Sequence, residues 1–141
     1  MLVSKGFFMT IMHVEYQGRL RTRALHMDSG SELLTDAPKD NNGEGQAFSP
    51  TDLLATSLAS CMLTIMGIKA RGLDLDIAGT RCEVEKIMQA NPRKVAEIKV
   101  KVLWGGQRLS SEQKAVLEQA ALTCPVFLSL DPALKKTLSW E

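Results

Sequence analysis

The sequence predicts an α+β fold from two observations. Alternating apolar and polar residues predict β-strands in three parts of the chain, residues 11–36, 73–104 and 135–140. Residues 49–72 and 109–124 instead carry helix-capping residues around apolar stretches of helical length. The pattern therefore predicts antiparallel sheets combined with two helices.

The N-terminal segment is expected to form two or three antiparallel strands between Ile11 and Asp36. Alternation is visible at residues 13–17 and 19–23, and glycines mark two turns. Residues 37–47, APKDNNGEGQA, contain Pro, Asn, Asp and Gly without periodicity. They predict a loop that leads directly to the first helix.

The first helix, residues 49–72, has the clearest ends in the chain. Ser49 is a favourable N-cap, and Pro50 suits the first helical position because its missing N–H costs nothing there. Asp52 complements the positive end of the helix dipole and acts as a capping residue. Basic residues in the last turn and Gly72 as the C′ residue suit the other end.

Residues 73–88 and 93–104 are predicted to pair as a hairpin with one face in water. In the second strand, alternate apolar residues fall on one face: Ala96, Ile98, Val100, Val102 and Trp104. The opposite face carries charged residues: Glu97, Lys99 and Lys101. The apolar face is expected to pack on the core.

The second helix is predicted to follow Ser110, which is a favourable N-cap with Gln113 three positions later. Its apolar stripe consists of Leu109, Val116, Leu117, Ala120 and Ala121. Cys124 is expected at or just past its end, because Pro125 disfavours a helical conformation in the residue before it. A short turn and a final strand complete the prediction.

Length and composition indicate one soluble globular domain over residues 1–141, with residues 1–10 as a poorly ordered N-terminal extension. The chain has 141 residues, of which 45% are hydrophobic and 23% charged. The net charge of +1 and the absence of a basic patch argue against nucleic-acid and membrane-surface partners. Only residues 49–72 approach the length of a membrane span, and they are rich in Ser and Thr.

Cysteine usage predicts a reducing compartment, the cytoplasm. The three cysteines are an odd number and too few for a disulfide scaffold, and no signal peptide is recognised. The cysteines and the two histidines show no metal-ligand spacing, so no metal site is predicted. The chain contains neither a Gly-rich phosphate loop nor a dinucleotide fingerprint, and no cofactor is predicted.

The first helix carries no charged residue from Leu53 to Ile68, which indicates that it is covered on both sides. One chain supplies a sheet for one side and only one other long helix, which is itself amphipathic. A homodimer in which a second copy covers the remaining face is therefore predicted. The alternative is a monomer in which two small sheets wrap the helix.

Cys61 lies in the middle of this apolar helix. A single buried cysteine most often acts as a small apolar residue, because apolar surroundings raise the pKa of a thiol. Cys61 is far from the helix start, and the dipole acts only within the first turn. Reactivity would require a cation from elsewhere, and the tract GRLRTRALH offers Arg19, Arg21 and Arg23, whose alternative role is a solvated strand face.

Several motifs together resemble the OsmC/Ohr family of small bacterial hydroperoxide-reducing proteins. They are the Gly- and Asn-rich loop, FSPTDLLATSLASC at the start of an apolar helix, a two-stranded segment, a second helix and TCPVFLSL. The similarity extends from about Val14 to the end of the chain. Its specific parts are Pro50 with the following polar pair and Leu53, Cys61 among small residues, and the Cys124–Pro125 pair.

The resemblance implies an OsmC-like fold in which antiparallel sheets wrap around two central helices in an intertwined homodimer. It also implies that Cys61 attacks an organic or hydrogen peroxide and becomes a sulfenic acid. Cys124 would condense with it as a disulfide, and a dithiol reductant would restore both thiols. Cys82 matches no family position and is predicted to be a packed strand residue.

The chain departs from the best-characterised members at the start of the first helix. They carry Asn-Pro-Glu where this chain has Ser49-Pro50-Thr51, so the acidic residue that orients their catalytic arginine is missing. Asp52 is half a helical turn out of phase with Cys61, so Asp52 does not replace the missing acidic residue. Arg21 is the predicted catalytic arginine, from its spacing to the following DSG turn, and Arg19 and Arg23 remain alternatives. The chain therefore resembles the broader OsmC-like branch.

The leading hypothesis is a thiol peroxidase, that is, a hydroperoxide reductase. One alternative is a non-catalytic small-molecule-binding or stress-related protein of the same fold. Another is a different cysteine-dependent activity, such as acyl or thioester hydrolysis. An assignable pair of an arginine and a carboxylate is the feature that would separate these alternatives.

Overall fold

The computed structural model describes residues 9–141, which fall into two compact units that divide between Pro50 and Thr51. Most of the predicted N-terminal extension, residues 1–8, lies outside the described residues. The prediction of one domain over residues 1–141 stays a prediction.

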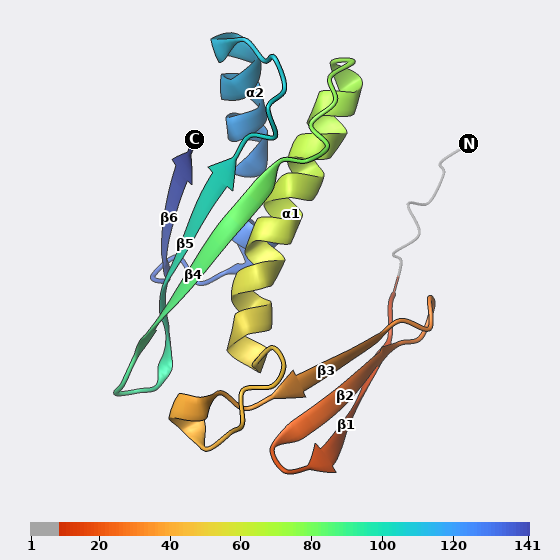
Figure 1. The fold of residues 1–141 in the computed structure, drawn as a ribbon, viewed down its shortest axis with the longest axis vertical. Helices are drawn as coiled ribbons and strands as arrows, with labels where there is room; N and C mark the ends of the chain where they lie inside the picture. The colour runs from red at the N-terminus through yellow and green to blue at the C-terminus, as the bar shows by residue number, and fades with distance from the viewer. Residues whose placement is uncertain (1–8) are drawn as a thin grey trace, which may run out of the picture. The chain divides into compact units, whose positions relative to one another are not determined.

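The first unit contains a three-stranded antiparallel sheet, where two or three antiparallel strands were predicted (Figure 1). Its strands are β1 (Met12–Gly18), β2 (Arg21–His26) and β3 (Glu32–Asp36), in the order β1-β2-β3. The turn between β1 and β2 places Arg19 at φ 56° and Leu20 at φ 62°. This is the conformation of a two-residue hairpin turn, which Asn and Gly usually occupy.

The predicted loop after β3 contains one short 3₁₀ helix, η1 (Lys39–Asn41), and folds back on the end of β3. The backbone N–H of Asp36 donates to the carbonyl of Phe48 at 3.0 Å. A Cβ atom on Gly43 would lie 1.7 Å from the carbonyl oxygen of Ala37, so this position requires glycine. The loop is therefore tightly packed against its own strand.

The second unit packs a mixed sheet, in the order β4-β5-β6, against helices α1 and α2 (Figure 1). Its elements, in chain order, are α1 (Pro50–Gly72), β4 (Arg81–Gln89), β5 (Lys94–Leu103), α2 (Ser111–Ala121), α3 (Pro125–Ser129) and β6 (Lys135–Trp140). The pair β5 and β6 is parallel, which corrects the prediction of purely antiparallel sheets. Parallel neighbours require a crossover connection, and α2 and α3 provide it.

Three further differences from the sequence prediction occur in this unit. Residues 73–80, predicted as the start of a strand, form turns and irregular backbone, and β4 begins only at Arg81. The segment after α2, predicted as a turn, is the short helix α3. Gly72, predicted to follow the first helix, is its last residue.

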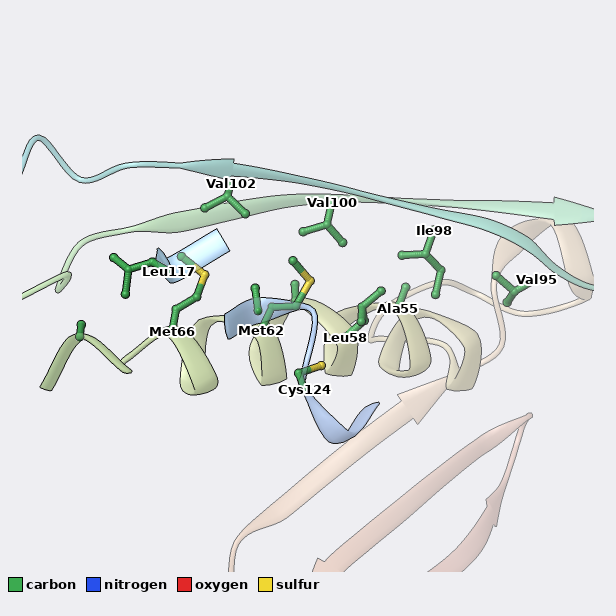
Figure 2. Packing of buried hydrophobic residues seen from close by; sticks show 13 residues of the cluster. Ala55, Leu58, Met62, Met66, Val95, Ile98, Val100, Val102, Leu117 and Cys124 are labelled. Carbon is green, nitrogen blue, oxygen red and sulfur yellow. The ribbon is translucent and has the colours of Figure 1, made fainter. Parts of the chain in front are cut away.

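The core lies between α1 and β5 (Figure 2). The side chains of Leu58, Met62 and Met66 on α1 point toward Ile98, Val100 and Val102 on β5, which confirms most of the predicted apolar face. Val95 replaces Ala96 on this face. Ile87 pairs with Glu97 and Met88 pairs with Val95, so Ala96 is the extra residue of a β-bulge.

Helix α1 buries only one side within the described residues. Its buried residues are Ala55, Leu58, Ala59, Met62, Met66 and Ala70. Leu54 and Ile68 on the same helix are 38% and 62% exposed. By length and composition α1 could cross a membrane, as the core helices of soluble proteins often could. One side of α1 packs in the core against β5.

Candidate functional site

Two of the predicted site residues, Cys61 and Cys124, lie in the second unit. Cys61 is half-buried near the middle of α1. Cys124 is fully buried in the core cluster (Figure 2). Cys124 is the N-cap of α3, with Pro125 at the first helical position, and its Sγ accepts a hydrogen bond from the backbone N–H of Phe127 at 3.2 Å. The start of α3 therefore fixes the position of this thiol.

The structure brings these two thiols together. Burial raises the pKa of Cys124 above its usual value, and a hydrogen bond with Cys61 raises the pKa of Cys124 further. The N–H of Phe127 opposes this shift and does not cancel it. At neutral pH Cys124 is thus a neutral thiol in contact with a second free thiol. This contact is what a pair of attacking and resolving cysteines requires, and the assignment of these roles stays a prediction.

Cys82 has a different environment. It lies on β4, is paired in register with Val102 and packs against the core, in agreement with the predicted strand packing. Burial raises the pKa of Cys82 to about 11. A thiol with this pKa is almost entirely protonated at neutral pH, as expected for a packed strand residue.

The three candidate arginines lie in the first unit and differ in burial. The side chain of Arg21 is 31% exposed, compared with 73% for Arg19 and 41% for Arg23. Arg23 forms an ion pair with Glu32, whose hydrogen bond with Arg23 lowers the pKa of that carboxyl. Arg21 is thus the arginine with the least access to water.

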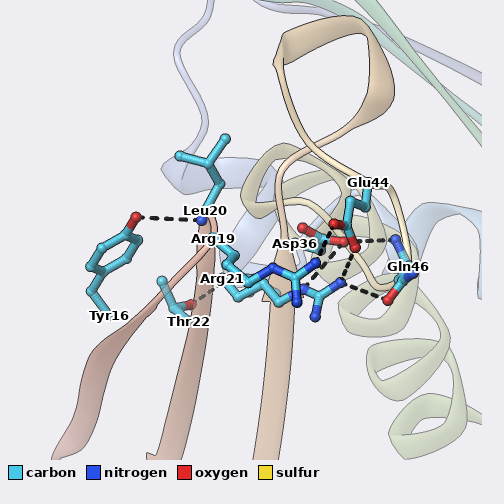
Figure 3. Close-up of polar contacts among 9 residues, drawn as sticks. Tyr16, Arg19, Leu20, Arg21, Thr22, Asp36, Glu44 and Gln46 are labelled. Atoms are coloured by element: carbon cyan, nitrogen blue, oxygen red, sulfur yellow. Dashed lines mark hydrogen bonds and ion pairs between the residues drawn. The ribbon is translucent and has the colours of Figure 1, made fainter.

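Arg21 is bound by three side chains (Figure 3). Its Nη2 donates to Glu44 Oε2 at 2.5 Å and to Gln46 Oε1 at 2.6 Å. Its Nε lies 3.7 Å from Asp36 Oδ2. Arg19 donates to the other oxygen of the same carboxylate, Glu44 Oε1, at 2.7 Å.

Sequence reasoning missed Glu44, Gln46 and Asp36. The signals for the first two were weak, since they are polar residues in a loop without periodicity. Asp36 is paired in register with Arg21 across β2 and β3, and its side chain is 2% exposed. A charged residue at the end of a predicted strand, opposite an arginine on the neighbouring strand, was the available signal.

A lysine side chain binds the start of α1. Lys86 Nζ on β4 donates to Thr51 Oγ1 at 2.9 Å and forms a salt bridge with Asp52 Oδ1 at 2.7 Å. Asp52 was predicted to act only as a capping residue, and it also has this lysine as a charge partner. Thr51 stands where the best-characterised OsmC/Ohr proteins carry an acidic residue, so the helix start here bears a different set of charges.

An open groove of about 610 Å³ runs between α1 and α2. Its apolar lining includes Ile65 and Ile68 from α1 and Val116 and Ala120 from α2. Ile65 lies one helical turn beyond Cys61 on the same side of α1. Among residues 9–141, no group of three or more His, Cys, Asp or Glu side chains is arranged to hold a metal ion.

Comparison with solved structures gives matches over the whole chain. A protein of Psychrobacter arcticus, provisionally described as an osmotic stress induced and detoxification response protein, is 49% identical, with a TM-score of 0.89 over 99% of this chain and 100% of that one. The organic hydroperoxide resistance protein OsmC of Legionella pneumophila is 21% identical, with a TM-score of 0.76 over 97% of this chain and 99% of that one. OhrB of Bacillus subtilis, an organic hydroperoxide resistance protein, is 18% identical, with a TM-score of 0.69 over 96% and 100%.

The last two likenesses show the shared fold, since their sequence identity is low. A search of curated proteins gives no match. The family model for the OsmC-like protein matches residues 43–139, which is more than half of the chain and includes both Cys61 and Cys124. The chain belongs to the OsmC-like family.

Proposed function

We propose that this protein reduces organic hydroperoxides or hydrogen peroxide by a thiol-dependent mechanism. The observation that carries the proposal is the contact between Cys61 and Cys124, two free thiols on neighbouring elements of the second unit. The OsmC-like family and the hydroperoxide-resistance proteins that share the fold support the same chemistry.

In the first step the Cys61 thiolate attacks one oxygen of the peroxide O–O bond. A sulfur–oxygen bond forms, the O–O bond breaks, and the leaving alkoxide or hydroxide takes a proton to become alcohol or water. Cys61 is oxidised to a sulfenic acid and the peroxide is reduced. The Cys124 sulfur then displaces the hydroxyl as water and forms a disulfide with Cys61, which a dithiol reductant returns to two thiols.

Arg21 is our proposed cation for this reaction. Cys61 lies far from the positive end of the helix dipole and among apolar neighbours, so its thiolate needs a charge from another element. Of the three candidate arginines, Arg21 is the least exposed and has the most side-chain partners. Arg23 is paired with Glu32 at the surface, which makes it a solvated strand residue.

The proposal includes a homodimer in a reducing cytoplasm. The exposed apolar residues of α1 support the dimer, because no other described element covers them. The three free cysteines support a reducing compartment.

A binding protein of the same fold is the second candidate function. The apolar groove between α1 and α2 favours it, since a groove of about 610 Å³ has the size of a small-molecule site. Such a protein would bind an apolar molecule without any change at Cys61.

Mass spectrometry with one equivalent of cumene hydroperoxide tests the function. The wild-type protein is expected to lose two hydrogens as the Cys61–Cys124 disulfide forms. Cys124→Ser is expected to gain one oxygen on Cys61 and to stop, because the resolving thiol is missing. Cys61→Ser is expected to consume no peroxide, and Cys82→Ala serves as the control that should behave as the wild type.

The result that contradicts the peroxidase is a wild-type protein whose mass does not change after this treatment. Binding of the corresponding alcohol without oxidation of Cys61 would favour the second candidate. Calorimetry with cumyl alcohol would measure that binding.

A further inference from the structure

We propose that Glu44, supported by Gln46 and Asp36, is the positioning residue for Arg21 and takes the place of the carboxylate that this chain lacks at the start of α1. The inference rests on the proposed function, in which the charge of Arg21 stabilises the Cys61 thiolate. Glu44 is a loop residue that lies 23 positions after Arg21 in the sequence.

The contacts fix the guanidinium at two of its nitrogens. Nη2 is shared between Glu44 Oε2 and Gln46 Oε1, while Nε faces Asp36 Oδ2 (Figure 3). Two hydrogen bonds at Nη2 and an ion pair at Nε together restrict the rotation of the guanidinium more than a single contact would. The network therefore sets the direction of Arg21 as well as its charge.

The backbone holds these acceptors in place. Gln46 donates its backbone N–H to Asp36 Oδ2 at 2.9 Å, so the loop is fastened to the same carboxylate that faces Arg21. The tight approach of Gly43 to Ala37 and the bridge between Thr35 and Phe48 fix the loop on either side. Glu44 is thus presented from a packed loop.

Asp36 and Glu44 contribute in different ways. The Asp36 side chain is buried, and a buried carboxylate is costly unless a cation lies nearby, so Arg21 and Asp36 stabilise each other. Glu44 is 42% exposed and binds both Arg19 and Arg21. Its replacement would disturb folding less, and Glu44 is therefore the residue to test.

Within the second unit, the acidic residue in the first turn of α1 already has its own cation. Asp52 forms a salt bridge with Lys86, and Thr51 accepts a hydrogen bond from the same ammonium group. The helix start is thus engaged with a lysine in this chain, and the carboxylates that bind Arg21 come from β3 and the loop after it.

The experiment measures the second-order rate of Cys61 oxidation by cumene hydroperoxide, from pH 5 to pH 10, in the full-length protein. Glu44→Gln keeps the shape of the side chain and removes its charge, and it is expected to slow oxidation about 10- to 100-fold at neutral pH because Arg21 is misplaced. In an Arg21→Met background the same change should have no further effect, since the residue that it positions is gone.

Two matched variants separate positioning from a general effect of charge or folding. Glu44→Gln combined with Gln46→Glu returns a carboxylate to Nη2 of Arg21 and is expected to restore most of the rate. Glu32→Gln removes the carboxylate of the neighbouring Arg23 pair and is expected to leave the rate unchanged.

A Glu44→Gln rate equal to that of the wild type would overturn the inference while leaving the proposed function intact. A wild-type protein that peroxide does not oxidise would overturn the function, and the NMR signals of the Arg21 guanidinium would then decide the positioning claim alone. Slow exchange of these protons in the wild type and fast exchange in Glu44→Gln would support the claim. Equal exchange in the two proteins would contradict it.

Discussion

The three cysteines have different surroundings. Cys124 and Cys82 both have a raised pKa because apolar surroundings disfavour the thiolate, and only Cys124 also contacts a second thiol. Cys82 faces Val102 of its own sheet and has no such partner among its described contacts. Residue type alone does not distinguish Cys124 from Cys82, because the difference depends on which groups each sulfur contacts.

The raised pKa of Cys82 predicts a loss of stability at high pH. The unfolded chain loses its Cys82 proton near pH 9, whereas the folded protein keeps it to about pH 11. The contribution of the neutral Cys82 thiol to the free energy of unfolding is therefore fully present below pH 9 and is lost as the pH rises through about 11. Because Cys82 is only half-buried and solvent screens its charge, we expect the free energy of unfolding to fall by about 1 kcal/mol.

Urea denaturation of the wild type and of Cys82→Ala at pH 7 and pH 10.5 measures this effect. The difference in the free energy of unfolding between the two proteins should shrink at the higher pH. A difference that stays constant between the two pH values would show that Cys82 does not titrate differently in the folded state.

The sequence was sufficient to name Cys61, Cys124 and Arg21 as candidate site residues, but it did not reveal what binds Arg21. Strand alternation and a family resemblance depend on residues close together in sequence. The contact between Arg21 and Glu44 depends on how an aperiodic loop folds back, and this follows from the Gly43 approach and the Phe48 bridge. Such a contact is settled by tertiary structure.

Among the elements, those with strong end signals were predicted best. Helix α1 begins at Pro50, directly after the predicted cap Ser49, and α2 begins directly after Ser110. The start of β4 was misplaced because the apolar residues at 73, 75 and 77 imitate strand alternation although they lie outside any strand. The bulge at Ala96 was missed because register depends on the partner strand, which one strand's sequence does not specify.

The capping box of α2 predicts a measurable contribution to stability. Ser110 Oγ accepts from the N–H of Gln113 at 3.1 Å, and the N–H of Ser110 donates to Gln113 Oε1 at 2.8 Å. Ser110→Ala removes the first bond and should lower the free energy of unfolding by about 1 kcal/mol. Ser110→Thr should retain most of the stability because its hydroxyl can accept the same bond.

Ser111→Ala is the control for this prediction, because Ser111 is exposed and lies inside the helix. Its effect should stay within about 0.5 kcal/mol of the wild type. Equal unfolding free energies for Ser110→Ala and Ser111→Ala in urea titrations would show that the capping box does not stabilise α2.

At the scale of the whole molecule, the main feature is apolar surface that the described chain leaves exposed. The α1 helix is apolar on more sides than one sheet and one helix cover, and Ile68 is 62% exposed at the edge of the groove. In the first unit, Val14 and Tyr16 of β1 are 66% and 65% exposed. Exposed apolar surface on several elements is characteristic of chains that bury it against a partner.

We therefore predict an obligate homodimer whose interface includes the exposed side of α1. Because folding and association are then linked, the thermal midpoint should rise with protein concentration, and sedimentation at low micromolar concentration should give the mass of two chains. Ile68→Glu places a charge in the interface and should lower the thermal midpoint or dissociate the dimer. Arg108→Glu, in an exposed loop, should sediment as the wild type does. A folded wild-type monomer at low micromolar concentration, with a thermal midpoint independent of concentration, would contradict the prediction and favour the alternative of a monomer in which α1 is the core helix.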